Sequence, residues 1–346
     1  MDIKKRDLTP VCFAYLREMV ILSDGDVTTC CLDAKGMNVL GNVNEMPLDK
    51  LWQERFLPWH WRNVEANLKR ASWESSLCNM CLKRSCMSAF NAIKTGDVQL
   101  IEGFHQRVHP FPVSLVIEPI SMCNYACWGC YSGTGELKRK SLLAMGTFNH
   151  HILPVIPKVR QVRLYNYGEP FLHPHIIDMI GSIRREGPTL NLHISTNGQL
   201  MTKEIAEVLV DAQVNYLIVS VHGGHTQEGL LKYSGRGPDI QVIRSNIEHL
   251  VELKKRKGKR LPWIFLKALL FNWNDSEEEM EAFLKFGKTL EVDFTGWGVN
   301  NSDLTFSSNR VSPGTQPYQY LVENKLLESN FYELPAWPPE AGTCIR

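Results

Sequence analysis

From about residue 110 onward, short runs rich in β-branched and aromatic residues alternate with longer segments whose apolar residues recur at helical spacing. The runs predicted as strands are 114–120, 161–167, 190–196, 216–222, 263–271 and 292–299. The segments predicted as helices are 173–186, 202–213, 239–257 and 276–290. Strands that alternate with helices favour a parallel sheet, so this α/β pattern predicts a partial or complete (β/α)6 barrel.

The alternation is absent before the segment "RVHPFP", which spans residues 107–112. We therefore expect a small irregular α+β domain over 1–109 and the barrel over 110–305. The remaining residues, 306–346, are expected to form a C-terminal tail that is either truncated or folded back.

The composition of the 346-residue chain is close to that of an ordinary globular protein, with 44% hydrophobic residues and a formal charge of +1. This charge gives no basic field for nucleic acid or a membrane surface. The polar N-terminus and the lack of a long apolar run predict a cytoplasmic protein without a membrane span. In a reducing compartment, the ten cysteines are expected to be metal ligands or catalytic thiols.

Three cysteines, Cys123, Cys127 and Cys130, follow the first predicted strand of the barrel. In parallel barrels the chemistry lies on the loops after the carboxyl ends of the strands. A structural zinc site normally closes with four protein ligands, whereas three thiolates suit an iron–sulfur cluster with one open iron. The alternatives are a zinc knuckle with a distant fourth ligand and three buried thiols.

The Cys-x3-Cys-x2-Cys spacing after a first barrel strand resembles the radical S-adenosylmethionine (SAM) superfamily. This resemblance implies that Cys123, Cys127 and Cys130 hold a [4Fe-4S] cluster whose fourth iron binds SAM. It further implies reductive cleavage of SAM to a 5′-deoxyadenosyl radical that abstracts a substrate hydrogen. One departure is the aromatic residue usually found just before the third cysteine: Trp128 stands one place early and Gly129 takes its position.

Later strand ends extend the resemblance through "NYGEPFLHP", "STNG", "SVHGG" and "YSGRGPD". The SAM-binding residues that the resemblance implies are Gly168, Glu169, Ser195, Asn197, Ser220 and Arg236. Two positions depart from the family pattern: Tyr167 replaces the first glycine of the Gly-Gly-Glu-Pro stretch, and His222 replaces the usual aspartate. Taken one at a time, these polar residues could also serve as caps or turns.

The N-terminal region resembles the auxiliary-cluster domains called SPASM and twitch, through its order of cysteines and its Leu-Gly-Asn-Val and Leu-Trp segments. In relatives this module usually follows the barrel, whereas here it precedes it. The resemblance implies that one auxiliary [4Fe-4S] cluster is held by Cys12, Cys30, Cys78 and Cys81. Structural zinc is the alternative for these four cysteines.

Three further cysteines have open roles. Cys31 and Cys86 either pack as small apolar residues or donate a hydrogen atom to a product radical. Cys344 either opens a second auxiliary module, serves as a ligand when the tail folds back, or is a free terminal thiol.

These resemblances imply a radical SAM oxidoreductase or isomerase, which we expect to oxidise or epimerise a sugar-like or other small polar substrate. Its electron donor is expected to be a flavodoxin or ferredoxin, with no nucleic-acid or membrane partner. A maturase that modifies ribosomal peptides is the alternative enzyme. A metal-stabilised binding module without catalysis is the alternative of another class.

Overall fold

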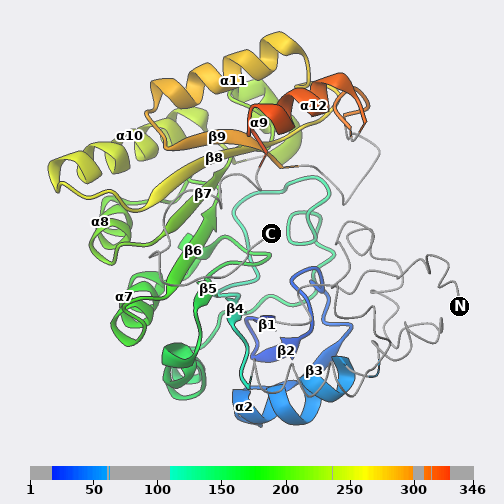
Figure 1. Cartoon of the computed structure of the whole chain (residues 1–346), viewed down its shortest axis with the longest axis vertical. Helices are drawn as coiled ribbons and strands as arrows, with labels where there is room; N and C mark the ends of the chain where they lie inside the picture. Colours follow the sequence, from blue (N-terminus) through cyan, green and yellow to red (C-terminus); the bar gives the residue numbers. More distant parts are fainter. Residues whose placement is uncertain are drawn as a thin grey trace, which may run out of the picture.

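The computed structural model describes residues 18–60, 62, 110–235, 237–298, 308–312 and 314–327. In these residues a nine-stranded sheet has the order β3-β2-β1-β4-β5-β6-β7-β8-β9. The strands are β1 (Glu18–Ile21), β2 (Asp26–Thr28), β3 (Val39–Asn42), β4 (Ser114–Ile117), β5 (Gln161–Arg163), β6 (Asn191–Thr196), β7 (Tyr216–Ser220), β8 (Trp263–Leu269) and β9 (Phe294–Gly298). From β4 to β9, each strand pairs in parallel with the next one along the chain. The six predicted strands are confirmed, and the sheet is an open, curved partial barrel (Figure 1).

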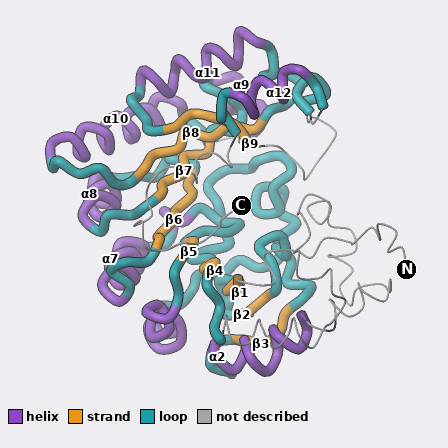
Figure 2. Tube along the Cα trace, in the orientation of Figure 1, coloured by secondary structure: helices purple, strands orange, loops and turns teal. Residues whose placement is uncertain are grey.

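Helices lie along the convex side of this sheet, and the long loop after β4 lies on the concave side (Figures 1 and 2). The helices are α2 (Leu48–Lys50), α6 (Met145–Thr147), α7 (Ile176–Glu186), α8 (Lys203–Asp211), α9 (Gln227–Ser234), α10 (Ile240–Arg256), α11 (Glu277–Thr289) and α12 (Gln316–Glu323). Shorter π and 3-10 segments are η1 (Leu51–Phe56), η4 (Phe148–Ile152), η5 (Leu153–Lys158) and η6 (Pro170–Leu172). The side chains of Thr202, Asp239 and Ser276 cap α8, α10 and α11, which explains where these predicted helices begin.

The N-terminal region contributes strands to the same sheet as the predicted barrel. Strand β1 pairs in parallel with β4, in a register that runs from Glu18 opposite Ser114 to Ile21 opposite Ile117. Strands β2 and β3 then extend the sheet as antiparallel neighbours. All four residues of β1 are buried, so this short strand shows no alternation of polar and apolar residues that a sequence pattern could detect.

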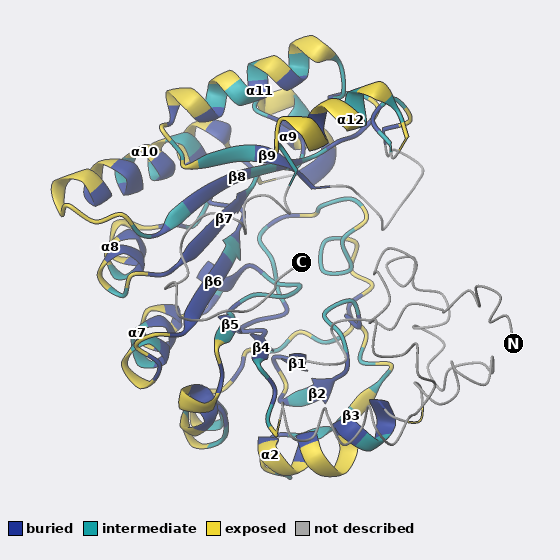
Figure 3. Ribbon diagram, viewed as in Figure 1, coloured by how far each residue is buried: buried dark blue, intermediate teal, exposed yellow. Residues whose placement is uncertain are grey.

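The two faces of the sheet bury different side chains. On the convex side, residues such as Leu192 and Ile194 pack with the helices in the main hydrophobic core. On the concave side, Tyr216, Ile218 and Phe265 form a second, smaller cluster. Strands β1, β4, β6 and β7 are almost entirely buried, and the dark ribbons of β6 and β7 are visible in Figure 3. Packed side chains therefore support the parallel strands on both faces of the sheet. The polar residues of the candidate site lie at the carboxyl ends of these strands.

Candidate functional site

The three cysteines of the loop after β4 are half-buried, and none forms a disulfide. Two backbone hydrogen bonds attach this loop to the end of α9: Ala126 N donates to Ser234 O over 3.1 Å, and Trp128 N donates to Tyr233 O over 2.9 Å. On its other side, Glu169 N donates to Met122 O over 2.9 Å. The loop is thus fixed between the segments that follow β5 and β7.

Glycines allow these segments to approach backbone to backbone. A Cβ atom on Gly168 would lie 1.9 Å from Ile120 O, and one on Gly133 would lie 2.5 Å from Cys127 N. Gly129 has a φ of 74°, in the left-handed region that glycine adopts without strain. This conformation explains why glycine, and not an aromatic residue, stands directly before Cys130.

The chemistry of the three thiols fits an iron–sulfur cluster. Burial raises the pKa of Cys123 to about 11 and that of Cys127 to about 12, so both are protonated at neutral pH and must lose protons to bind iron. Tyr125 N donates to Cys123 Sγ over 3.5 Å, the kind of contact that stabilises a bound thiolate. In the described ranges, no three His, Cys, Asp or Glu side chains form a group suited to a metal ion. A [4Fe-4S] cluster differs from a single ion because each thiolate binds a different iron.

Glu169 is buried beside this loop and accepts three hydrogen bonds. Its Oε1 accepts from Phe171 N at 3.1 Å and from Thr196 Oγ1 at 2.7 Å, and its Oε2 accepts from Asn197 N at 2.8 Å. Burial raises the pKa of Glu169 to about 7, although the three donors oppose this shift. The carboxylate of Glu169 thus connects the segment after β5 to the end of β6. Thr196, whose hydroxyl donates to this carboxylate, was not predicted from the sequence.

The raised pKa of Glu169 predicts a specific pH dependence of stability. In the unfolded chain the carboxyl group loses its proton at about pH 4.3, whereas in the folded chain it loses it at about pH 7. The folded state therefore holds the extra proton between these values, and the free energy of unfolding should fall by about 4 kcal/mol as the pH rises through this window. Glu169→Gln should remove this part of the slope. Urea titrations of the reconstituted chain at pH 5 and pH 7.5 measure the free energy of unfolding at each pH. If this free energy changes equally with pH in the unsubstituted chain and in Glu169→Gln, the assignment is contradicted.

Asn197 lies directly against the cysteine loop. Its Nδ2 donates to Asn124 Oδ1 over 2.8 Å and lies 4.0 Å from Cys123 Sγ. Ser195 and Ser220 are half-buried at the ends of β6 and β7, and their register places them on the concave side with Phe265 and Lys267. Arg236 lies outside the described residues.

His222 cannot reproduce the aspartate that it replaces. Its ring meets Tyr233 edge-on, with centroids 5.5 Å apart. Burial, helped by the positive charge of Lys267, lowers the pKa of His222 to about 3. This side chain is therefore a neutral imidazole at neutral pH, in contrast to an anionic carboxylate.

Only part of the expected auxiliary site lies in the described residues. Cys30 opens a turn in which Leu32 N lies 3.3 Å from Cys30 Sγ and Asp33 N donates to Cys30 O over 2.9 Å. Cys31 packs against the buried cluster of Val20, Leu22 and Val116, which favours the packing interpretation over that of a hydrogen donor. The other cysteines, Cys12, Cys78, Cys81, Cys86 and Cys344, lie outside the described residues.

Comparison with models of known protein families identifies two domains in this chain. A model of the radical SAM superfamily matches residues 117–287. The chain carries a radical SAM domain. An iron–sulfur cluster-binding domain of the SPASM type matches residues 12–82, so the auxiliary module precedes the radical SAM domain, as the sequence indicated. These two domains imply [4Fe-4S] clusters and SAM as cofactors. The match to the SPASM-type domain ends at residue 82 and does not include Cys86.

Curated relatives of the radical SAM domain have different activities. A GTP 3′,8-cyclase from Nostoc is 33% identical over 116 residues, which cover 31% of this chain and 34% of the relative. A tungsten-containing aldehyde ferredoxin oxidoreductase cofactor-modifying protein from Pyrococcus furiosus is 27% identical over 46% of this chain and 44% of its own length. An S-adenosyl-L-methionine-dependent 2-deoxy-scyllo-inosamine dehydrogenase from Niallia circulans is 24% identical over 40% of this chain and 53% of its own. The matches thus span about a third to a half of these relatives' own length, and the relatives do not share one reaction.

Solved structures share the fold. SuiB from Streptococcus suis, bound to S-adenosylmethionine, superposes with a TM-score of 0.51 and 14% identity over 91% of this chain and 70% of SuiB. No helix among the described residues is long and apolar enough to cross a membrane.

Proposed function

We propose that this radical SAM enzyme binds SAM between the cysteine loop and the ends of β5 and β6, and that it abstracts a hydrogen atom from a small polar substrate. The observation that carries the proposal is the contact of three segments at one end of the sheet. Glu169 touches Met122 through its backbone and Asn197 through its side chain, and Asn197 touches Asn124 beside Cys123. A cysteine loop, a buried carboxylate and an amide side chain therefore face one location.

The residues of the chain have separate tasks in this proposal. Cys123, Cys127 and Cys130 would hold a [4Fe-4S] cluster, which supplies the electron that cleaves SAM. Glu169 would bind the amino group of SAM, and its carboxylate becomes fully charged when that cation arrives. Asn197 and Ser195 would orient the ribose. Burial of this region excludes water, which protects a reactive carbon radical from side reactions.

The substrate is proposed to lie over the concave face of the sheet. Near the strand ends this face presents Ser195, Ser220 and Lys267, while aromatic residues such as Tyr216 and Phe265 fill the layer below. Hydroxyl and ammonium groups suit a small polar molecule, and the match to a 2-deoxy-scyllo-inosamine dehydrogenase supports this class. The auxiliary cluster would accept an electron from the substrate radical, which suits a net two-electron oxidation.

A change in the cluster spectrum on addition of SAM tests the function. We expect the anaerobically reconstituted chain, reduced with dithionite, to give an electron paramagnetic resonance signal that changes when SAM is added. The change reflects SAM binding to the open iron and is absent from a module in which metal only supports the fold. Zinc in place of iron after anaerobic reconstitution, or an iron signal insensitive to SAM, would contradict the proposal.

A further inference from the structure

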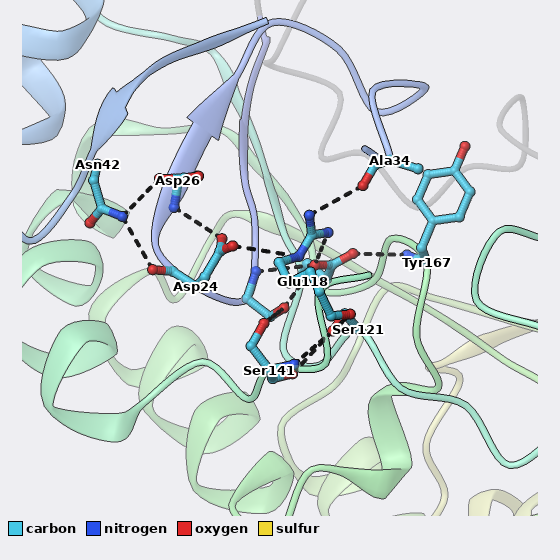
Figure 4. Close-up of polar contacts among 10 residues, drawn as sticks. Asp24, Asp26, Ala34, Asn42, Glu118, Ser121, Ser141 and Tyr167 are labelled. Atoms are coloured by element: carbon cyan, nitrogen blue, oxygen red, sulfur yellow. Dashed lines mark hydrogen bonds and ion pairs between the residues drawn. The ribbon is translucent and has the colours of Figure 1, made fainter. Parts of the chain in front are cut away.

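A buried carboxylate, Glu118, joins the N-terminal module to the radical SAM domain. It lies directly after β4, and its side chain is completely buried. Its Oε2 accepts from Ser23 N at 3.1 Å, from Ser23 Oγ at 2.9 Å and from Arg139 Nη2 at 2.7 Å. Its Oε1 accepts from Tyr167 N at 3.3 Å, as Figure 4 shows. One carboxylate thus contacts the turn between β1 and β2 and the loop that carries Glu169.

Arg139 extends the connection to the turn that carries Cys30. The guanidinium donates through Nη1 to Ala34 O over 3.2 Å, and its Nε lies 3.8 Å from the carboxylate of Asp24. Its side chain is 11% exposed, so water screens these contacts weakly. Because a guanidinium holds its donors in a fixed plane, the positions of Ala34 and Glu118 are set relative to each other.

We propose that Glu118 and Arg139 couple the auxiliary cluster site to the SAM site. The route runs from the Cys30 turn through Ala34 O to Arg139, from Arg139 to Glu118, and from Glu118 to the amide of Tyr167. That amide directly precedes Gly168 and Glu169, which approach the cysteine loop. A fixed conformation of the Cys30 turn therefore holds the loop of Gly168 and Glu169 in place. Glu118 and Arg139 act as positioning residues. The inference rests on the function proposed above and adds a dependence of SAM affinity on the auxiliary module.

A second ion pair joins the same two segments and provides a matched control. Lys35 Nζ lies 2.8 Å from Glu136 Oε2, but these side chains are 44% and 53% exposed. An exposed pair is screened by water and contributes little rigidity. Glu136→Gln should therefore leave the coupling intact, although it removes a contact between the same parts of the chain.

A double-mutant cycle on SAM affinity measures the coupling. We expect Cys30→Ala alone to weaken SAM binding about tenfold, as a coupling of ordinary size would do. In the Arg139→Gln background, Cys30→Ala should cause little further loss, since the route is already broken. In the Glu136→Gln background the tenfold effect should persist. Equal effects of Cys30→Ala in all backgrounds would overturn the proposal.

Amide hydrogen exchange of the metal-free chain gives an independent readout. Glu118→Gln and Arg139→Gln should each speed exchange over residues 165–169, whereas Glu136→Gln should not. Arg139→Lys should fail to restore protection because a single ammonium cannot reach Ala34 and Glu118 together. Unchanged exchange in both glutamine variants would also refute the coupling. If the unsubstituted chain fails to bind SAM, the proposed function itself is wrong, whereas SAM binding with additive effects refutes the coupling alone.

Discussion

The Gly168→Ala variant is expected to bind SAM at least about 100-fold more weakly than the unsubstituted chain. The new methyl group would lie 1.9 Å from Ile120 O and 2.8 Å from Met122 O, so the loop after β5 must move away from the cysteine loop. A displacement of about 1 Å in a positioning segment can cost about 100-fold in catalytic rate, and we expect a loss of similar size in SAM affinity. The dissociation constant of SAM, followed by its effect on the cluster spectrum, measures the loss.

Gly181→Ala is the matched control for this substitution. Gly181 lies inside α7, and a Cβ atom there has no neighbour within 4 Å. Alanine favours a helix interior, so this variant should keep SAM affinity and gain about 1 kcal/mol of unfolding free energy. Normal SAM affinity in Gly168→Ala would show that the close approach to Ile120 is not needed for binding.

Replacing Cys123, Cys127 and Cys130 together with alanine is expected to abolish cleavage of SAM. The variant should also lose about half of its iron, because the proposed auxiliary cluster would have its own ligands and each [4Fe-4S] cluster holds the same amount of metal. Iron analysis after anaerobic reconstitution and assay of 5′-deoxyadenosine provide the two readouts.

Cys31→Ala is the control for the cysteine variant, since Cys31 packs against Val20, Leu22 and Val116. It should retain the iron content and the SAM cleavage of the unsubstituted chain. If the triple alanine variant still cleaves SAM, the cysteine loop is not the site of the SAM-binding cluster.

The sequence predicted the radical SAM domain well because its strands and helices repeat a strong pattern. Residues 190–196 and 216–222 carry β-branched runs long enough to identify as strands, and Asp239 marks the beginning of a long amphipathic helix. Strand β1 was missed because four buried residues carry no periodicity. Its partner, β4, lies almost 100 residues further along the chain, and no local pattern records such a pairing.

Site residues that belong to a sequence motif could be predicted, whereas residues that join the site only through contacts in the folded chain could not. The cysteine spacing and the sequence "GEP" pointed to Cys123 and Glu169. Thr196 has no motif of its own, and it is found only because its hydroxyl reaches Glu169 in the folded chain. Arg139 gave no signal either, although a charged residue such as Glu118 directly after an apolar strand could have marked a buried pair.

Formation of 5′-deoxyadenosine from SAM by the anaerobically reconstituted, dithionite-reduced chain tests the central claim most directly. The account predicts that the unsubstituted chain releases 5′-deoxyadenosine and that the triple alanine variant of Cys123, Cys127 and Cys130 releases none. A reconstituted chain that carries iron and binds SAM, yet releases no 5′-deoxyadenosine with or without candidate substrates, would contradict it.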